Sequence, residues 1–149
     1  MYQHILLTLD SSSLAEQAIP HAENLAGATG AHLTLLSCVE PYVVSMPLMA
    51  APGPIYEIDT DMDALVAERE DYVNGIKEML IARGLKVSAV VLRGRPADEI
   101  LHFATHNGID VIVMTTHGRS GFGKFIYGSV ADRVLHGAHI PVLLIRAAE

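Results

Sequence analysis

The sequence predicts an α/β domain in which a doubly wound, five-stranded parallel sheet carries helices on both faces. Short apolar runs alternate with helix-like segments, which gives the order β-α-β-α-β-α-β-α-β. Strands without an alternating polar face are typical of a parallel sheet that helices cover on both sides. We expect the Rossmann-like strand order 3-2-1-4-5. With 149 residues, the chain is predicted to form one domain over residues 1–149.

The composition predicts a folded protein that does not bind nucleic acid. Half of the residues are hydrophobic and 18% are charged, as in ordinary compact domains. The net charge is −7 and lies mostly in residues 57–78, whereas nucleic-acid polymers need a basic face. No apolar run approaches the ~18 residues that span a membrane, and no signal peptide is recognisable. With Cys38, a lone cysteine expected as a buried thiol, this predicts a cytoplasmic protein without a membrane partner.

The first half of the chain is predicted to contain two strands, one helix and a long loop. The DSSS cluster at residues 10–13 offers side-chain oxygens that can cap the helix. Pro20 is expected to kink this helix or to lie in its early turns. The loop holds several prolines and is interpreted either as a lid or partner surface or as a plain connection. The predicted order is strand 2–9, helix 14–28, strand 31–39 and loop 40–58.

The second half continues the alternation. Apolar residues at three-, four- and seven-residue steps predict a long helix that ends at Gly84. Pro96 suits a first helical position, and Asp98 and Glu99 favour a first turn electrostatically. The predicted order is helix 59–83, strand 87–92, helix 96–107, strand 111–115, helix 129–136 and strand 141–145.

Residues 111–129, VIVMTTHGRSGFGKFIYGS, carry the main functional signal. A buried strand breaks into a loop with three glycines, and a helix begins where the loop ends. Main-chain N–H groups in such a place can hold phosphate, and no acidic residue occurs from 111 to 131. If the first and fourth strands are neighbours, Asp10 lies beside this loop, where doubly wound sheets bind ligands.

Two other sites have weaker support. Residues 118–124 fit the NTPase phosphate loop G-x-x-x-x-G-K, but Phe125 stands where a Ser or Thr should ligate magnesium. His102 and His106 lie four residues apart on a predicted helix and could chelate a metal, although such pairs are more often surface or partly buried residues. The spacing supports no Ser-His-Asp or Cys-His nucleophile.

Taken together, these segments resemble the universal stress protein family in its small single-domain form. The family's nucleotide motif is G-x-x-G, nine residues, then G-[ST], and residues 115–118 (TTHG) and 128–129 (GS) stand at its two ends. ILLTLDSSSLAEQAI resembles the family's opening strand and helix, GRPADEI its G-x-P turn, and PVLLIR its terminal strand. The resemblance covers almost the full length of the chain.

The resemblance implies a site for ATP or another adenine nucleotide. It places Asp10 near the ribose or a metal and the main chain of Val39 beside adenine. A carboxylate near phosphates needs a bridging cation, here Mg²⁺ or Mn²⁺. The residues implied to contact the nucleotide are Asp10, Ser11, Val39, Thr115, Gly118, Arg119, Ser120, Gly121, Gly128, Ser129 and Val130.

The chain departs from the family pattern at two positions, which leaves its function open. Thr115 replaces the first glycine of the motif and could obstruct a nucleotide, and Ser11 replaces the glycine that commonly follows the aspartate. One interpretation is a nucleotide-binding stress-response homodimer, paired through residues 141–145. Another is a scaffold of the same fold that recruits a protein partner. A third is an enzyme that hydrolyses or transfers adenylate; we expect no catalytic residue and at most a slow ATPase, because no general base is recognisable.

Overall fold

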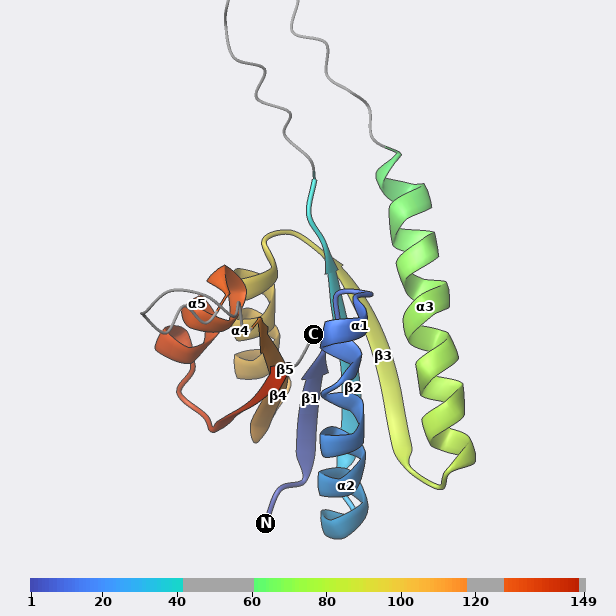
Figure 1. Cartoon of the computed structure of the whole chain (residues 1–149), viewed down its shortest axis with the longest axis vertical. Helices are drawn as coiled ribbons and strands as arrows, with labels where there is room; N and C mark the ends of the chain where they lie inside the picture. Colours follow the sequence, from blue (N-terminus) through green and yellow to red (C-terminus); the bar gives the residue numbers. More distant parts are fainter. Residues whose placement is uncertain (42–60, 118–127, 148–149) are drawn as a thin grey trace, which may run out of the picture.

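The computed structural model describes residues 1–41, 61–117 and 128–147, and a five-stranded sheet lies at its centre (Figure 1). The strands are β1 (His4–Thr8), β2 (His32–Val39), β3 (Lys86–Arg93), β4 (Val111–His117) and β5 (Val142–Ala147). Their order is β3-β2-β1-β4-β5, and all four pairings are parallel. The predicted fold class and strand order are confirmed.

Helices cover the two faces of the sheet in separate groups (Figure 1). One face carries α1 (Ser13–Glu16), α2 (Ile19–Thr29) and α3 (Met62–Ala82). The other face carries α4 (Pro96–His106) and α5 (Ser129–Gly137). No helix in the described ranges is long and apolar enough to cross a membrane.

The alternation of side chains along the strands builds two apolar cores, one under each group of helices. Leu7 belongs to the core under α1, α2 and α3, whereas its neighbour Leu6 belongs to the core under α4 and α5. Both leucines are fully buried. Burying such a side chain contributes about 1.5–3 kcal/mol, so apolar runs on both faces of the strands are what this fold requires.

Several predicted boundaries differ from the observed ones. The helix predicted over residues 14–28 is two helices, because Pro20 has no N–H to donate to the preceding turn and stands in the first turn of α2. The strand predicted over residues 111–115 continues to His117, because its ladder with β5 continues to Ala147. The loop predicted over residues 40–58 lies outside the described residues from position 42 onward.

Asp110 joins the start of β1 to the turn before β4. Its Oδ2 accepts hydrogen bonds from the main-chain N–H groups of Gln3 (2.6 Å) and His4 (2.8 Å), and its own N–H donates to the His4 carbonyl at 2.9 Å. The two N–H groups stabilise the ionised carboxyl and lower its pKa below the ordinary 3.8. Asp110 thereby fixes one end of the β1–β4 contact.

Asp110 is therefore predicted to give a pH-dependent contribution to stability. A lowered pKa in the folded state stabilises the protein fully above the ordinary pKa, and this contribution is lost as the pH falls through the folded-state pKa. Asp110→Asn should lower the free energy of unfolding by about 1 kcal/mol at pH 7, and the difference from wild type should shrink as the pH falls below the ordinary pKa of 3.8. Urea unfolding at several pH values measures this. Asp71→Asn, on the exposed side of α3, is the control. An equal loss of unfolding free energy in Asp71→Asn would contradict this role of Asp110. A loss in Asp110→Asn that is the same at every pH would contradict it as well.

Candidate functional site

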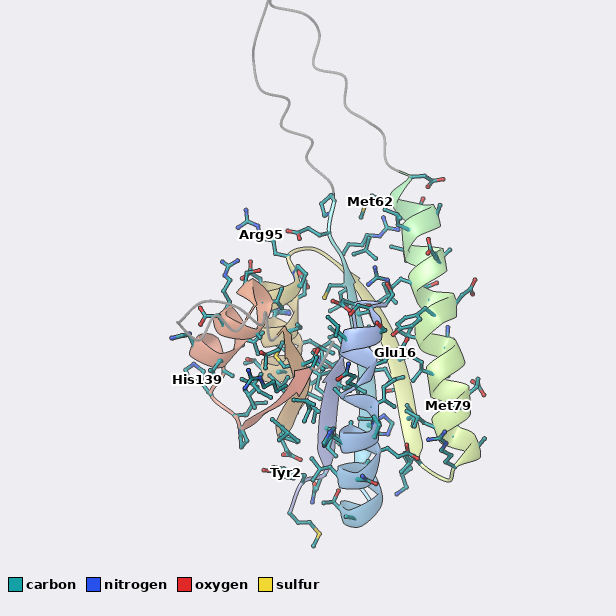
Figure 2. All side chains as sticks on the ribbon, viewed as in Figure 1. Tyr2, Glu16, Met62, Met79, Arg95 and His139 are labelled. Atoms are coloured by element: carbon teal, nitrogen blue, oxygen red, sulfur yellow. The ribbon has the colours of Figure 1, made fainter. Side chains whose placement is uncertain are left out.

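The candidate site lies at the carboxyl edge of the sheet, where β1 and β4 are neighbours. The chain leaves β1 toward α1 on one face and returns to β5 through α5 on the other, so the winding reverses between these two strands. Figure 2 labels Met62 and Arg95 near this edge and Tyr2 at the opposite one. Ligands of doubly wound sheets bind at such a reversal, and the predicted adjacency of the first and fourth strands is confirmed.

Asp10 lies in a tight turn just beyond β1. Its Oδ1 accepts hydrogen bonds from the N–H (3.0 Å) and the hydroxyl (2.6 Å) of Ser12. The Ser12 hydroxyl in turn accepts from the N–H of Ala15 at 3.1 Å, so the N-cap of α1 is Ser12 and not Asp10. The Asp10 carboxylate is exposed and held in one direction, which suits a group that meets a ligand or a cation.

The turn requires an unfavourable backbone conformation at Ser11. Its φ is 65°, and it is the one non-glycine residue with a positive φ in the described part of the chain. A side chain in this region costs about 1–2 kcal/mol, whereas glycine adopts it without strain. The family that the chain resembles commonly has a glycine at this position, and the positive φ gives a physical reason for it.

The start of α5 presents main-chain donors. Its N-cap is Gly128, which offers no side-chain cap. The first N–H groups of a helix have no partner within the helix, so they are available to an anion. Ser129 is exposed and Val130 packs against the core under α4 and α5. The acidic residue of this turn, Asp132, lies 3.6 Å from the Nδ1 of His136.

The end of β2 is tied to the end of β1 by Ser37 and Arg69, which the sequence did not indicate. The fully buried Ser37 hydroxyl donates to the Leu9 carbonyl at 2.5 Å. Arg69 of α3 donates from Nη1 to the Ser37 hydroxyl at 3.0 Å and reaches the Cys38 carbonyl at 3.5 Å. Arg69 was overlooked because it stands in an acidic helical stretch, 32 residues from Ser37.

Val39 and Thr115 complete the described edge. Val39 ends β2, its side chain is buried, and its carbonyl accepts the Gly94 N–H at 3.0 Å. A carbonyl has two lone pairs, so one acceptor position on Val39 remains for a ligand. Thr115 is half-buried within β4, opposite Ile145 of β5.

Seven of the predicted contact residues therefore belong to segments that end or begin at this edge. They are Asp10, Ser11, Val39, Thr115, Gly128, Ser129 and Val130. Gly118, Arg119, Ser120 and Gly121 lie outside the described residues.

The Asp10 carboxylate fits a hard cation only in part. Carboxylate oxygen is a ligand that Mg²⁺ and Mn²⁺ accept. No group of three or more His, Cys, Asp or Glu side chains within residues 1–41, 61–117 and 128–147 could hold a metal. A cation at Asp10 would have to take its other ligands from phosphate groups and water.

The side chains beside the edge provide no thiol nucleophile. Cys38 is half-buried, and burial, followed by the nearby Glu99 carboxylate, raises its thiol pKa to about 12. The thiol stays protonated at neutral pH. Cys38 was expected to be buried, and the structure shows it half-buried. The Tyr72 hydroxyl of α3 donates to the carboxylate of Glu16 at 3.0 Å, which joins α3 to α1.

Comparison with protein families gives a match over nearly the whole chain. The model described as "Universal stress protein family" matches residues 1–146. Universal stress protein MJ0531 of Methanocaldococcus jannaschii is 32% identical over 148 residues, which cover 98% of this chain and 83% of that protein.

Solved structures of similar proteins share the fold. The structure of protein MJ0577, also from Methanocaldococcus jannaschii, has a TM-score of 0.77 and 26% identity, with 100% of this chain and 99% of that chain covered. A universal stress protein from Archaeoglobus fulgidus was solved in complex with dAMP (TM-score 0.67, 21% identity, 97% and 98% covered). Another universal stress protein was solved in complex with cAMP (TM-score 0.66, 20% identity, 99% and 98% covered).

The Asp10 turn predicts an unusual gain of stability. Ser11→Gly should remove the strain at φ 65° and raise the melting temperature by about 1–4 °C, even though glycine adds freedom to the unfolded chain. Ser13→Gly is the control, because residue 13 begins a helix, where glycine is unfavourable. Thermal unfolding followed by circular dichroism measures both. A fall in Ser11→Gly, or a similar rise in Ser13→Gly, would show that the Ser11 backbone is not strained.

Proposed function

The chain belongs to the universal stress protein family, and on this premise we propose that it binds an adenine nucleotide such as ATP and acts as a stress-response homodimer. The nucleotide occupies the switch point between β1 and β4. It serves as a conformational or partner-binding signal, because no general base for hydrolysis is recognisable among the described residues near Asp10.

The observation that carries this proposal is the pairing of β1 with β4. β4 leads into the glycine-rich loop, and its pairing with β1 brings it to the same edge of the sheet as the turn at Asp10. Two segments that are about 100 residues apart in the sequence therefore lie at one site. The family membership and the similar proteins that hold dAMP and cAMP support an adenine nucleotide as the ligand.

Each part of the nucleotide has a partner in this proposal. The adenine lies at the end of β2, beside the main chain of Val39. The phosphates lie against the loop glycine Gly118 and the first N–H groups of α5 at Gly128 and Ser129, where the helix dipole favours negative charge. Asp10 contacts the ribose or a Mg²⁺ or Mn²⁺ ion that bridges to the phosphates.

The homodimer forms through β5 in this proposal. β5 is an edge strand with β4 as its neighbour in the sheet, and Leu143 on it is 39% exposed. An edge strand presents unpaired N–H and C=O groups, and a second copy can complete them across a two-fold axis.

Arg69 acts as a positioning residue for the site. The adenine end of the site is the end of β2 and the ribose end is Leu9–Asp10, and the Arg69–Ser37–Leu9 hydrogen bonds join the two. The last β1–β2 ladder pair is Thr8 with Leu36, so these bonds hold the two ends together beyond the ladder. Loss of the Arg69 guanidinium should shift the end of β2 relative to the end of β1. It should not remove any direct contact with the nucleotide.

The first prediction of the proposal is saturable binding of ATP that depends on the glycine-rich loop. Isothermal titration calorimetry with ATP and Mg²⁺ should show one site per chain. Gly118→Val should weaken binding at least tenfold, because a side chain there obstructs the phosphates. Gly75→Val is the control, because a Cβ built at Gly75 meets no atom within 4 Å.

The other outcomes select the remaining interpretations. No saturable binding in wild type, with binding restored in Thr115→Gly, would mean that Thr115 blocks the site and the protein is a scaffold. Rapid release of phosphate or transfer of adenylate would mean that it is an enzyme. Unchanged affinity in Gly118→Val would mean that the loop does not hold the phosphates.

The second prediction separates positioning from direct contact. Arg69→Met should weaken the binding of adenosine and of ATP by the same factor, about tenfold. The substitution is expected to displace the strand ends that contact the adenine and the ribose, and both ligands contain these groups. Ser129→Ala should weaken ATP and leave adenosine unchanged. Arg83→Met is the matched control, because Arg83 is at the far end of α3 and pairs with the half-buried Glu23. If Arg69→Met loses affinity for ATP but not for adenosine, Arg69 is a phosphate ligand. If the variant keeps its affinity for both, Arg69 does not position the site.

A further inference from the structure

A pair of histidines on α4 stands apart from the site at the carboxyl edge. His102 and His106 are exposed and one helical turn apart, and their rings are stacked with centroids 4.1 Å apart and planes at 29°. We propose that His102 and His106 form a binding site for one borderline divalent transition-metal ion, of the class of Cu²⁺, Ni²⁺ and Zn²⁺. This site is independent of nucleotide binding.

The distance between the rings suits chelation. Imidazoles that share one ion at a metal–nitrogen distance of about 2.0–2.1 Å bring their ligating nitrogens to about 3 Å from each other. The two rings are already in contact, so a rotation of exposed side chains is enough to converge their nitrogens. Because both ligands sit on one helix, little conformational freedom is lost when the second nitrogen binds.

A main-chain hydrogen bond prepares His106 as a ligand. Its Nδ1 lies 2.8 Å from the His102 carbonyl, which can only accept, so the proton of the neutral ring is on Nδ1. The Nε2 then carries the lone pair that binds metal. Histidines that ligate metals commonly donate their other ring N–H to a carbonyl or carboxylate in this way, which fixes the tautomer.

No other histidine contact in the described part of the chain combines a stacked pair of imidazoles with a main-chain hydrogen bond to one of the rings. His4 and His32 have centroids 6.0 Å apart and planes at 70°, and the Nε2 of His32 is bonded to the Ser88 hydroxyl at 2.9 Å. His136 also bonds a main-chain carbonyl through Nδ1, but its neighbour one turn back is Asp132. Within the described residues, His102 and His106 are the stacked imidazole pair.

The chemistry of the pair selects the ion. Neutral imidazole prefers borderline ions such as Zn²⁺, Ni²⁺ and Cu²⁺, with Cu²⁺ bound most strongly, whereas Mg²⁺ and Ca²⁺ prefer oxygen. No third side chain completes a cluster within the described ranges, so water fills the remaining positions. The bound ion is therefore accessible to solvent and can exchange. This site prefers transition-metal ions, whereas the carboxylate at Asp10 suits Mg²⁺ or Mn²⁺.

The test is titration of the full chain with Ni²⁺ and Zn²⁺ at pH 7.5, without nucleotide, followed by competition with a chromogenic chelator. Wild type should bind one equivalent, and His102→Ala and His106→Ala should each weaken it at least tenfold. The double variant should bind no more weakly than either single variant, because one lost ligand already destroys the chelate. Alanine is favourable in a helix, so these exposed substitutions keep α4 folded.

The controls are His136→Ala and His4→Ala, which should bind within twofold of wild type. The proposal is overturned if either single variant on α4 binds like wild type, or if a control variant loses as much affinity. ATP binding should be unchanged in His102→Ala and His106→Ala, so failure of this site and failure of the nucleotide proposal are separate results.

Discussion

The parallel pairing of β1 with β4 is the contact on which the rest of the structure depends. It places the reversal of the winding between these two strands, so that helices return on opposite faces and two separate cores form. Asp110 fixes the amino end of this contact through the N–H groups of Gln3 and His4. The candidate site lies at its carboxyl end, beside the start of α1.

A few polar contacts at this carboxyl end add to its apolar packing. The Asp10–Ser12 hydrogen bonds hold one carboxylate in place and force Ser11 into a strained backbone. The buried Ser37 hydroxyl, with Arg69 behind it, joins the next strand end to the same turn. Strain and buried polar groups are costly, and their concentration at one edge is typical of a ligand site.

The sequence predicted the fold well because apolar strands and helix stops are local signals. Five apolar runs and the intervening helices indicated a doubly wound sheet, and the expected strand order 3-2-1-4-5 is the observed one. Pro20 was expected to kink the first helix or to lie in its early turns, and it lies in the first turn of α2. The separate helix α1 before it was not predicted. The identity of the α1 cap depends on the geometry of the turn, and the role of Arg69 depends on a contact 32 residues away. Neither leaves a periodic pattern in the sequence.

The central claim is that the switch point between β1 and β4 holds an adenine nucleotide. A crystal structure of the protein grown with ATP and Mg²⁺ tests it most directly. The account predicts density for adenine beside Val39, for the ribose near Asp10, and for phosphates at the start of α5 beside Gly128 and Ser129. An empty carboxyl edge at saturating ATP, or a nucleotide bound on another surface, would contradict it.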